Sequence, residues 1–187
     1  PTFLRASTAY GLSPRIRFDL VVNNLTAWAF TTGEVHLKSD GTAWRPIVHV
    51  EDIAAAYVAI VEAPREAVHG AAFNIGMTDE NYRIRDIAEI VHRMVPGSTL
   101  GFAAGAEADK RNYRVDCDLI RRVLPSYQPR WTCRLGVDQL LEAYAAFGLK
   151  LAEFEGERYN RIAHMKHRLA NGTVDADFRP VTQKAAA

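Results

Sequence analysis

Cysteine, net charge and long apolar runs are all scarce in this sequence of 187 residues. The two cysteines, Cys117 and Cys133, have no short spacing, so they give neither a zinc signature nor a secreted disulfide framework. The formal net charge is only +1, so no overall field directs the chain to nucleic acid or to a membrane surface. No apolar stretch approaches the roughly 20 residues that span a bilayer. We therefore expect a cytoplasmic protein with neither a nucleic-acid nor a membrane partner.

The composition, 48% hydrophobic and 24% charged, is typical of a globular protein, and strand and helix patterns alternate along the chain. Strands are expected at 2–7, around 35–37, and at 45–50, 71–75 and 99–103. Helices are expected at 19–32, 53–63, 84–95, 118–124, 137–147 and 156–169, with loops at 76–79 and 104–112. Such alternation favours an α/β protein with a mainly parallel sheet, followed by a helical tail.

Three stretches carry a family resemblance: Leu4-Arg-Ala-Ser-Thr-Ala-Tyr-Gly-Leu-Ser-Pro-Arg15, Ser39-Asp-Gly-Thr-Ala-Trp-Arg-Pro-Ile-Val-His-Val-Glu-Asp-Ile-Ala54 and Asp109-Lys-Arg-Asn-Tyr-Arg-Val-Asp116. In this order they resemble the extended short-chain dehydrogenase/reductase family, specifically its NAD-dependent nucleotide-sugar epimerases and dehydratases. The second stretch is the strongest match, and the resemblance extends to about Leu149. It implies the C-terminal part of a Rossmann-type parallel sheet, interleaved with a small mixed α/β substrate-binding lobe. Residues 1–149 would form this part, and residues 150–187 a helical extension.

The resemblance also implies a chemistry for which this chain has no catalytic residue. The family transfers hydride to NAD, with a tyrosine as general base and a lysine four residues later. None of the seven tyrosines has lysine at that spacing, and no glycine-rich turn follows a strand to hold the NAD pyrophosphate. Because the family places both motifs upstream, we expect about 100–150 residues of such sequence to be missing. NAD should therefore bind poorly to this chain alone.

Two arginines are the leading candidates for binding a nucleoside-diphosphate sugar. The resemblance has Arg45 and Arg111 converge on the diphosphate, whose oxygens suit the planar guanidinium fork. The alternative is an ordinary ion pair, with Asp40 or Asp52 for Arg45 and with Asp109 or Asp116 for Arg111. Arg114 competes with Arg111 for the phosphate role.

The remaining candidates follow from the resemblance. Asn24 and Leu25 match an asparagine–leucine pair that holds the nucleotide, although the neighbouring Asn23 makes the helical register ambiguous. Thr8 stands where many relatives have a substrate-contacting asparagine. Ala6, Ser7 and Ala9 would line the nicotinamide side, where small side chains allow close approach.

Histidines give no metal site. His164 and His167 lie three residues apart but lack a third ligand or an HExxH arrangement. His49 ends a strand and Asp52 follows it, and we expect Asp52 to cap the next helix. No metal is therefore expected.

Three readings remain. The first is the substrate-binding portion of an NAD-dependent epimerase or dehydratase, completed by a missing N-terminal half or by self-association through exposed strand edges. The second is a catalytically inactive nucleotide-sugar-binding module that needs a partner chain. The third is an interaction domain that uses the basic run from Lys110 to Arg134.

Overall fold

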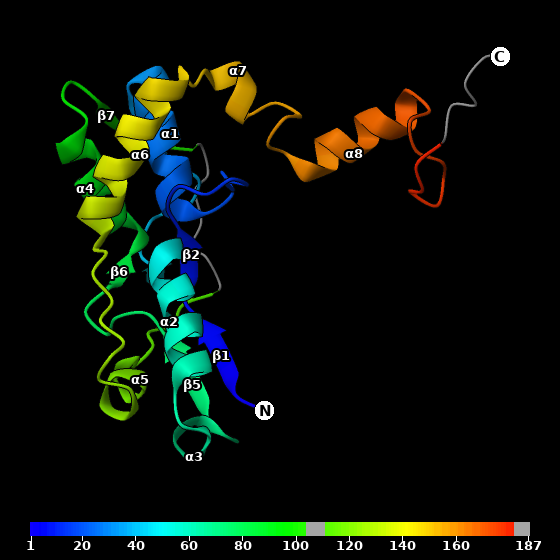
Figure 1. Ribbon diagram of the computed structural model, residues 1–187. Helices are drawn as coiled ribbons and strands as arrows, with labels where there is room; N and C mark the ends of the chain where they lie inside the picture. Colours follow the sequence, from blue (N-terminus) through cyan, green and yellow to red (C-terminus); the bar gives the residue numbers. More distant parts are fainter. Residues whose placement is uncertain (104–110, 182–187) are drawn as a thin grey trace. The chain divides into compact units, whose positions relative to one another are not determined.

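The structure, a computed structural model, describes residues 1–103 and 111–181 and divides into two units, Pro1–Gly148 and Leu149–Ala187 (Figure 1). The first unit contains, in chain order, β1 (Phe3–Ala6), β2 (Thr8–Tyr10), α1 (Val21–Thr32), β3 (Glu34–Leu37), β4 (Trp44–His49), α2 (Val50–Glu62), α3 (Arg65–Val68), β5 (Ala72–Ile75), β6 (Asn81–Arg83), α4 (Ile84–Met94), β7 (Thr99–Phe102), α5 (Asp118–Val123) and α6 (Cys133–Phe147). The second unit contains α7 (Leu151–Phe154) and α8 (Arg161–Ala170).

Parallel strand pairs dominate the first unit and confirm the predicted α/β fold class. β1 pairs with β5, β2 with β4, and β3 with β7, all in parallel, and β6 adds an antiparallel edge to β4. The strand expected over 2–7 ends at Ala6. Ser7 makes one more backbone bond to Ile75 (3.0 Å), and Thr8 then pairs with Ile47 in a different sheet. The chain therefore passes directly from one sheet into the next.

Several elements differ from the sequence prediction. β6 and α3 were not expected, because a three-residue strand and a four-residue helix are too short to show a period. α6 begins at Cys133, where the Thr132 hydroxyl accepts a bond from the Leu135 amide (3.4 Å). The helix expected at 156–169 begins only at Arg161, where the Asn160 side chain caps the first turn.

Helix α1 forms one wall of the site described below, and its sequence explains its limits. Val22, Leu25 and Ala29 recur at helical spacing and are buried. Gly33 ends the helix in the left-handed region (φ 73°) and donates its amide to the Ala29 carbonyl (3.0 Å). The end of α1 thus leads straight into β3.

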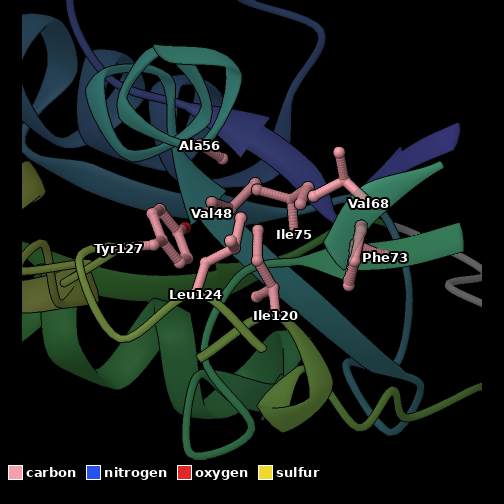
Figure 2. Packing of buried hydrophobic residues seen from close by; sticks show 8 residues of the cluster. All are labelled: Val48, Ala56, Val68, Phe73, Ile75, Ile120, Leu124 and Tyr127. Carbon is pink, nitrogen blue, oxygen red and sulfur yellow. The ribbon is translucent and has the colours of Figure 1, made fainter. Parts of the chain in front are cut away.

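In an apolar cluster, side chains of α2, β5 and α5 pack against the buried end of β4 (Figure 2). Figure 2 labels its eight residues: Val48, Ala56, Val68, Phe73, Ile75, Ile120, Leu124 and Tyr127. Phe73 and Ile75 from β5 are fully buried, and Ala56 from α2 and Ile120 from α5 are as well. The cluster holds the β1–β5 pair and the β2–β4–β6 sheet in one core.

The second unit is small, and its longer helix, α8, has no buried residue. An isolated antiparallel bridge joins Val174 and Pro180 beyond it. Across both units, the helices in the described residues include none with the length and apolar character to cross a bilayer.

Candidate functional site

A pocket of about 670 Å³ opens between α1, β3 and the start of β4. It brings together the five residues that the sequence nominated for the substrate: Thr8, Asn24, Leu25, Arg45 and Arg111. The remaining lining residues are Asp19, Leu20, Val21, His36, Leu37, Lys38, Ser39, Ile84 and Tyr113. The lining carries more positive than negative charge, which suits an anionic ligand.

Arg45 is buried in the wall of this pocket, with 6% of its surface exposed. Its Nη1 donates to the carbonyl of Trp44 (2.7 Å) and to the carbonyl of Arg111. Its guanidinium carbon lies 5.5 Å from the centre of the Tyr113 ring. Arg45 therefore also positions the segment that carries Arg111.

The acids that offered an alternative role for Arg45 are engaged elsewhere. Asp40 accepts from the amide and the hydroxyl of Thr42 (2.9 and 2.8 Å). Asp52 accepts from the backbone of a distant loop, as described below. For Arg111, Asp109 lies outside the described residues and Asp116 accepts from the Asp118 amide (2.8 Å).

The structure separates Arg111 from its competitor. Arg111 lines the pocket, whereas the Arg114 guanidinium lies over the ring of Trp44, 4.7 Å from its centre. Arg83 lies over the same ring at 5.3 Å. Asn112 accepts a bond from the Trp44 amide (3.0 Å) and keeps the segment alongside β4. The sequence alone did not separate these arginines, because they stand three residues apart.

The structure also shows which of the two neighbouring asparagines of α1 faces the pocket. Asn23 is buried, accepts from the Gly11 amide (2.9 Å) and donates to the Arg17 carbonyl (3.0 Å), so it holds the loop before the helix. Asn24 donates to the Phe18 carbonyl (2.8 Å) and lines the pocket. Of the two asparagines, the one that reaches the pocket is thus Asn24.

Ala6, Ser7 and Ala9 do not line this pocket. Ala6 pairs with Ile75 at the end of β1, and Ala9 pairs with Val48 in β2. The Ser7 hydroxyl lies 3.9 Å from the buried Cys117 sulfur, and burial raises the pKa of that thiol. These residues form a separate group near the carboxyl end of β1.

The prediction that Asp52 caps α2 is wrong, because His49 does so. His49 Nδ1 accepts from the Glu51 amide (3.2 Å), so the neutral ring donates from Nε2 to Gln139 Oε1 (2.9 Å). Asp52 instead accepts from the amides of Arg130 and Trp131 (3.1 and 3.0 Å) and fixes the loop before α6. Both partners lie almost 80 residues away in sequence, so local patterns gave no sign of them.

Several lining residues were missed. His36 of β3, Lys38 directly after it and Tyr113 of the segment beside β4 line the pocket but were not nominated. A signal existed for β3: the apolar Val35 and Leu37 alternate with Glu34 and His36, which therefore share the opposite face. In the part of the chain that the structure describes, no group of three potential metal ligands is present.

The His49 site should make stability depend on pH. Burial lowers the pKa of His49 from its ordinary value of 6.5, and the nearby Arg130 charge adds to this. The hydrogen bond that His49 donates to Gln139 and the charges of Glu51 and Asp52 oppose the shift. The unfolded chain therefore takes up a proton near pH 6.5 that the folded ring resists. Stability should be full above pH 6.5 and fall below it, by at most about 1.4 kcal/mol per pH unit.

Urea unfolding of the wild type and of His49→Gln at pH 7.5 and 5.5 measures this. The pH difference should shrink in His49→Gln and persist in the matched control His69→Gln, where the histidine is exposed. An equal pH difference in wild type and His49→Gln would contradict it.

The chain resembles known proteins in sequence and in fold. Residues 1–76 match the model of the NAD dependent epimerase/dehydratase family. The predicted family resemblance is confirmed. The epimerase/dehydratase match covers the first two of the three motifs, including Arg45, and the third lies outside it.

Solved structures of epimerases and dehydratases share the fold. UDP-glucuronic acid 4-epimerase from Bacillus cereus, solved with UDP-glucuronic acid and NAD, aligns with a TM-score of 0.64 at 22% identity, over 78% of this chain and 45% of that one. The NDP-hexosamine 5,6-dehydratase TunA gives 0.64 at 20% identity, over 76% and 45%. dTDP-glucose 4,6-dehydratase from Bacillus anthracis, solved with NAD, gives 0.62 at 20% identity, over 76% and 44%. The chain thus spans less than half the length of these structures.

Proposed function

We propose that this chain is the substrate-binding portion of an NAD-dependent nucleotide-sugar epimerase or dehydratase. The complete enzyme would transfer hydride between NAD and a nucleoside-diphosphate sugar. The observation that carries the proposal is the single pocket that gathers Arg45, Arg111, Thr8, Asn24 and Leu25 from four separate segments of the chain.

The pocket has the size and charge that such a ligand needs. Its volume of about 670 Å³ falls within the range usual for small-molecule sites. Arg45 and Arg111 meet at one wall, where Arg45 donates to the Arg111 carbonyl. Two guanidinium forks suit the two charges of a diphosphate. The buried position of Arg45 would strengthen its charge-assisted bond, whereas Arg111 is exposed.

We assign the remaining roles by position in this pocket. Thr8, next to β4, would contact the sugar through its hydroxyl, which both donates and accepts. Asn24 and Leu25 would hold the nucleoside against α1. Residues 1–149 would then supply the binding function, and residues 150–187 remain an extension to which no role is assigned.

We include NAD in the proposal for the complete enzyme, in which it would accept the hydride and return it. This chain would contribute Ala6, Ser7 and Ala9, whose small side chains would allow close approach of the nicotinamide. The pyrophosphate would be held by sequence outside this chain. A cytoplasmic compartment fits the proposal, since both cysteines are free thiols.

The partner that completes the enzyme would cover the outer edge of β1. β5 occupies one edge of β1, and in the described residues no strand pairs with the other. Phe3 is 54% exposed beside it. An apolar stripe on α2 is also exposed: Tyr57 and Val58 by 55% each, and Val61 by 82%. We assign these surfaces to a dinucleotide-binding half of the kind that would complete the length of the related structures.

Isothermal titration with UDP-, dTDP- and GDP-sugars and with pyrophosphate tests the binding function. At least one nucleotide sugar should bind the folded chain more tightly than pyrophosphate does. Absence of binding by all of them, in a sample with a cooperative thermal transition, would overturn the proposal.

The alternative is an inactive nucleotide-sugar-binding module, favoured by the absence of Tyr-x-x-x-Lys from the sequence. Co-expression with a dinucleotide-binding half of a related epimerase separates the two. A stable complex that, with NAD, converts a nucleotide sugar into an epimerised or dehydrated product supports the enzyme. Nucleotide-sugar binding without turnover supports the module, and a homodimer would favour self-association over a separate partner.

A further inference from the structure

We propose that Asn81, together with Asn112, is a positioning residue for the ligand. The two side chains hold residues 111–115, here called the Arg111 segment, against the body of the first unit, so that Arg111 lines the pocket. Neither asparagine belongs to the pocket lining. This inference rests on the proposed function and concerns residues that act on the ligand only through Arg111.

The Arg111 segment is attached to the rest of the chain mainly by side chains. It forms neither helix nor strand. Among the described residues, a single backbone–backbone bond joins it to the body, from the Tyr113 amide to the Trp44 carbonyl, and that bond is long at 3.5 Å. The position of the segment therefore depends on the side chains that meet its backbone.

Asn81 supplies the most complete of these attachments. Its Oδ1 accepts from the Val115 amide (2.9 Å), and its Nδ2 donates to the Val115 carbonyl (2.9 Å). Nδ2 also donates to the Thr78 carbonyl (2.7 Å), so both of its hydrogens are used. Asn81 is only 9% exposed, and little water competes for these bonds. One side chain thus replaces the pair of bonds that a neighbouring strand would make with Val115.

The backbone of Asn81 is itself fixed to the strand that carries the first arginine. Asn81 of β6 pairs with Pro46 of β4, the residue directly after Arg45. At the other end of the segment, Arg45 donates to the Arg111 carbonyl, and Asn112 accepts from the Trp44 amide (3.0 Å). The same strand therefore sets the position of both arginines relative to each other.

Release of Val115 should cost affinity through the geometry of Arg111. A guanidinium binds phosphate best as a planar fork with both N–H groups aligned, so a small displacement loses part of the interaction. Asn112 is exposed, and its bond to Trp44 competes with water, so its contribution should be smaller than that of the buried Asn81.

Calorimetric titration with UDP, dTDP, GDP and pyrophosphate tests this in a double-mutant cycle. For the probe that binds the wild type best, Asn81→Ala should weaken binding by about tenfold, the scale of a charged hydrogen bond. In an Arg111→Ala background the same change should cost no more than about twofold, because the group that Asn81 positions is already absent. A residue that only maintains the fold would cost the same in both backgrounds.

Asn160→Ala is the matched control. Asn160 also accepts a backbone amide with its side chain, from Ala163 (3.1 Å), but at the start of α8 in the second unit. Its loss should leave the affinity for every probe unchanged.

Trypsin cleavage after the exposed Arg114 measures the attachment without any ligand. Asn81→Ala removes both bonds that hold the next residue, Val115, and should speed this cleavage by at least about tenfold. Asn160→Ala should cleave at the wild-type rate. Where Asn81→Ala fails to fold, the exposed Asn112→Ala takes its place and should show a smaller loss of affinity that also disappears in the Arg111→Ala background.

The outcomes separate this inference from the proposed function. If the wild type binds a probe but the variant binds equally well, or loses as much affinity in the Arg111→Ala background, the positioning role is wrong and the binding function stands. Cleavage of Asn81→Ala at the wild-type rate also overturns the role. If the folded wild type binds none of the probes, the proposed function fails and this inference with it.

Discussion

Truncation of Phe73 to alanine should lower the free energy of unfolding by about 3–5 kcal/mol. Phe73 has no exposed surface and packs in the cluster that joins α2, β5 and α5 (Figure 2). The substitution removes the ring and leaves a cavity that β5, which is paired with β1, has little freedom to fill. Urea unfolding followed by circular dichroism measures the loss.

Phe102→Ala is the matched control for this prediction. Phe102 is also a strand phenylalanine, but it is 54% exposed on β7, so its truncation should change stability by no more than about 0.5 kcal/mol. Equal losses in the two variants would show that the cluster around Phe73 does not form the main core.

Replacement of Arg45 by alanine should weaken nucleotide-sugar binding by about 1.5–3 kcal/mol, the value of a hydrogen bond to a charged group. The structure adds a second effect, because Arg45 also holds the Arg111 carbonyl. Loss of Arg45 therefore releases the segment that carries the second arginine. Calorimetric titration with the nucleotide sugar that binds best measures the change.

Arg45→Lys distinguishes charge from geometry. Lysine keeps the positive charge but loses the planar fork, so this variant should recover only part of the affinity. Arg122→Ala removes an exposed arginine on α5, outside the pocket, and should leave binding unchanged. Wild-type affinity in Arg45→Ala would reject the assignment of the diphosphate to this wall.

The candidate site shows where local patterns stop being informative. The sequence nominated Arg45 and Arg111 because arginine in these motifs resembles a phosphate site, and the structure brings both to one pocket. It did not separate Arg111 from Arg114, since that depends on which of them stacks over Trp44. Neither did it nominate His36, whose orientation depends on Glu34, Trp28 and the space at Gly101.

The strands and helices of the fold show the same limit of local patterns. Strands and helices with a clear period, such as β5 and α4, appear where the sequence predicts them, because alternation and helical spacing are local properties. β6 is defined only by its pairing with β4, and Ser7 divides the predicted first strand only because Thr8 meets Ile47.

By itself, the sequence determined the α/β class, the family resemblance and the arginines worth testing, all of which depend on residue type and spacing along the chain. Tertiary structure alone decided which polar groups meet. Asp52 illustrates the reason: its carboxylate satisfies the amides of Arg130 and Trp131, and His49 caps the helix in its place. A buried carboxylate must find donors wherever the fold supplies them, and these lie almost 80 residues away.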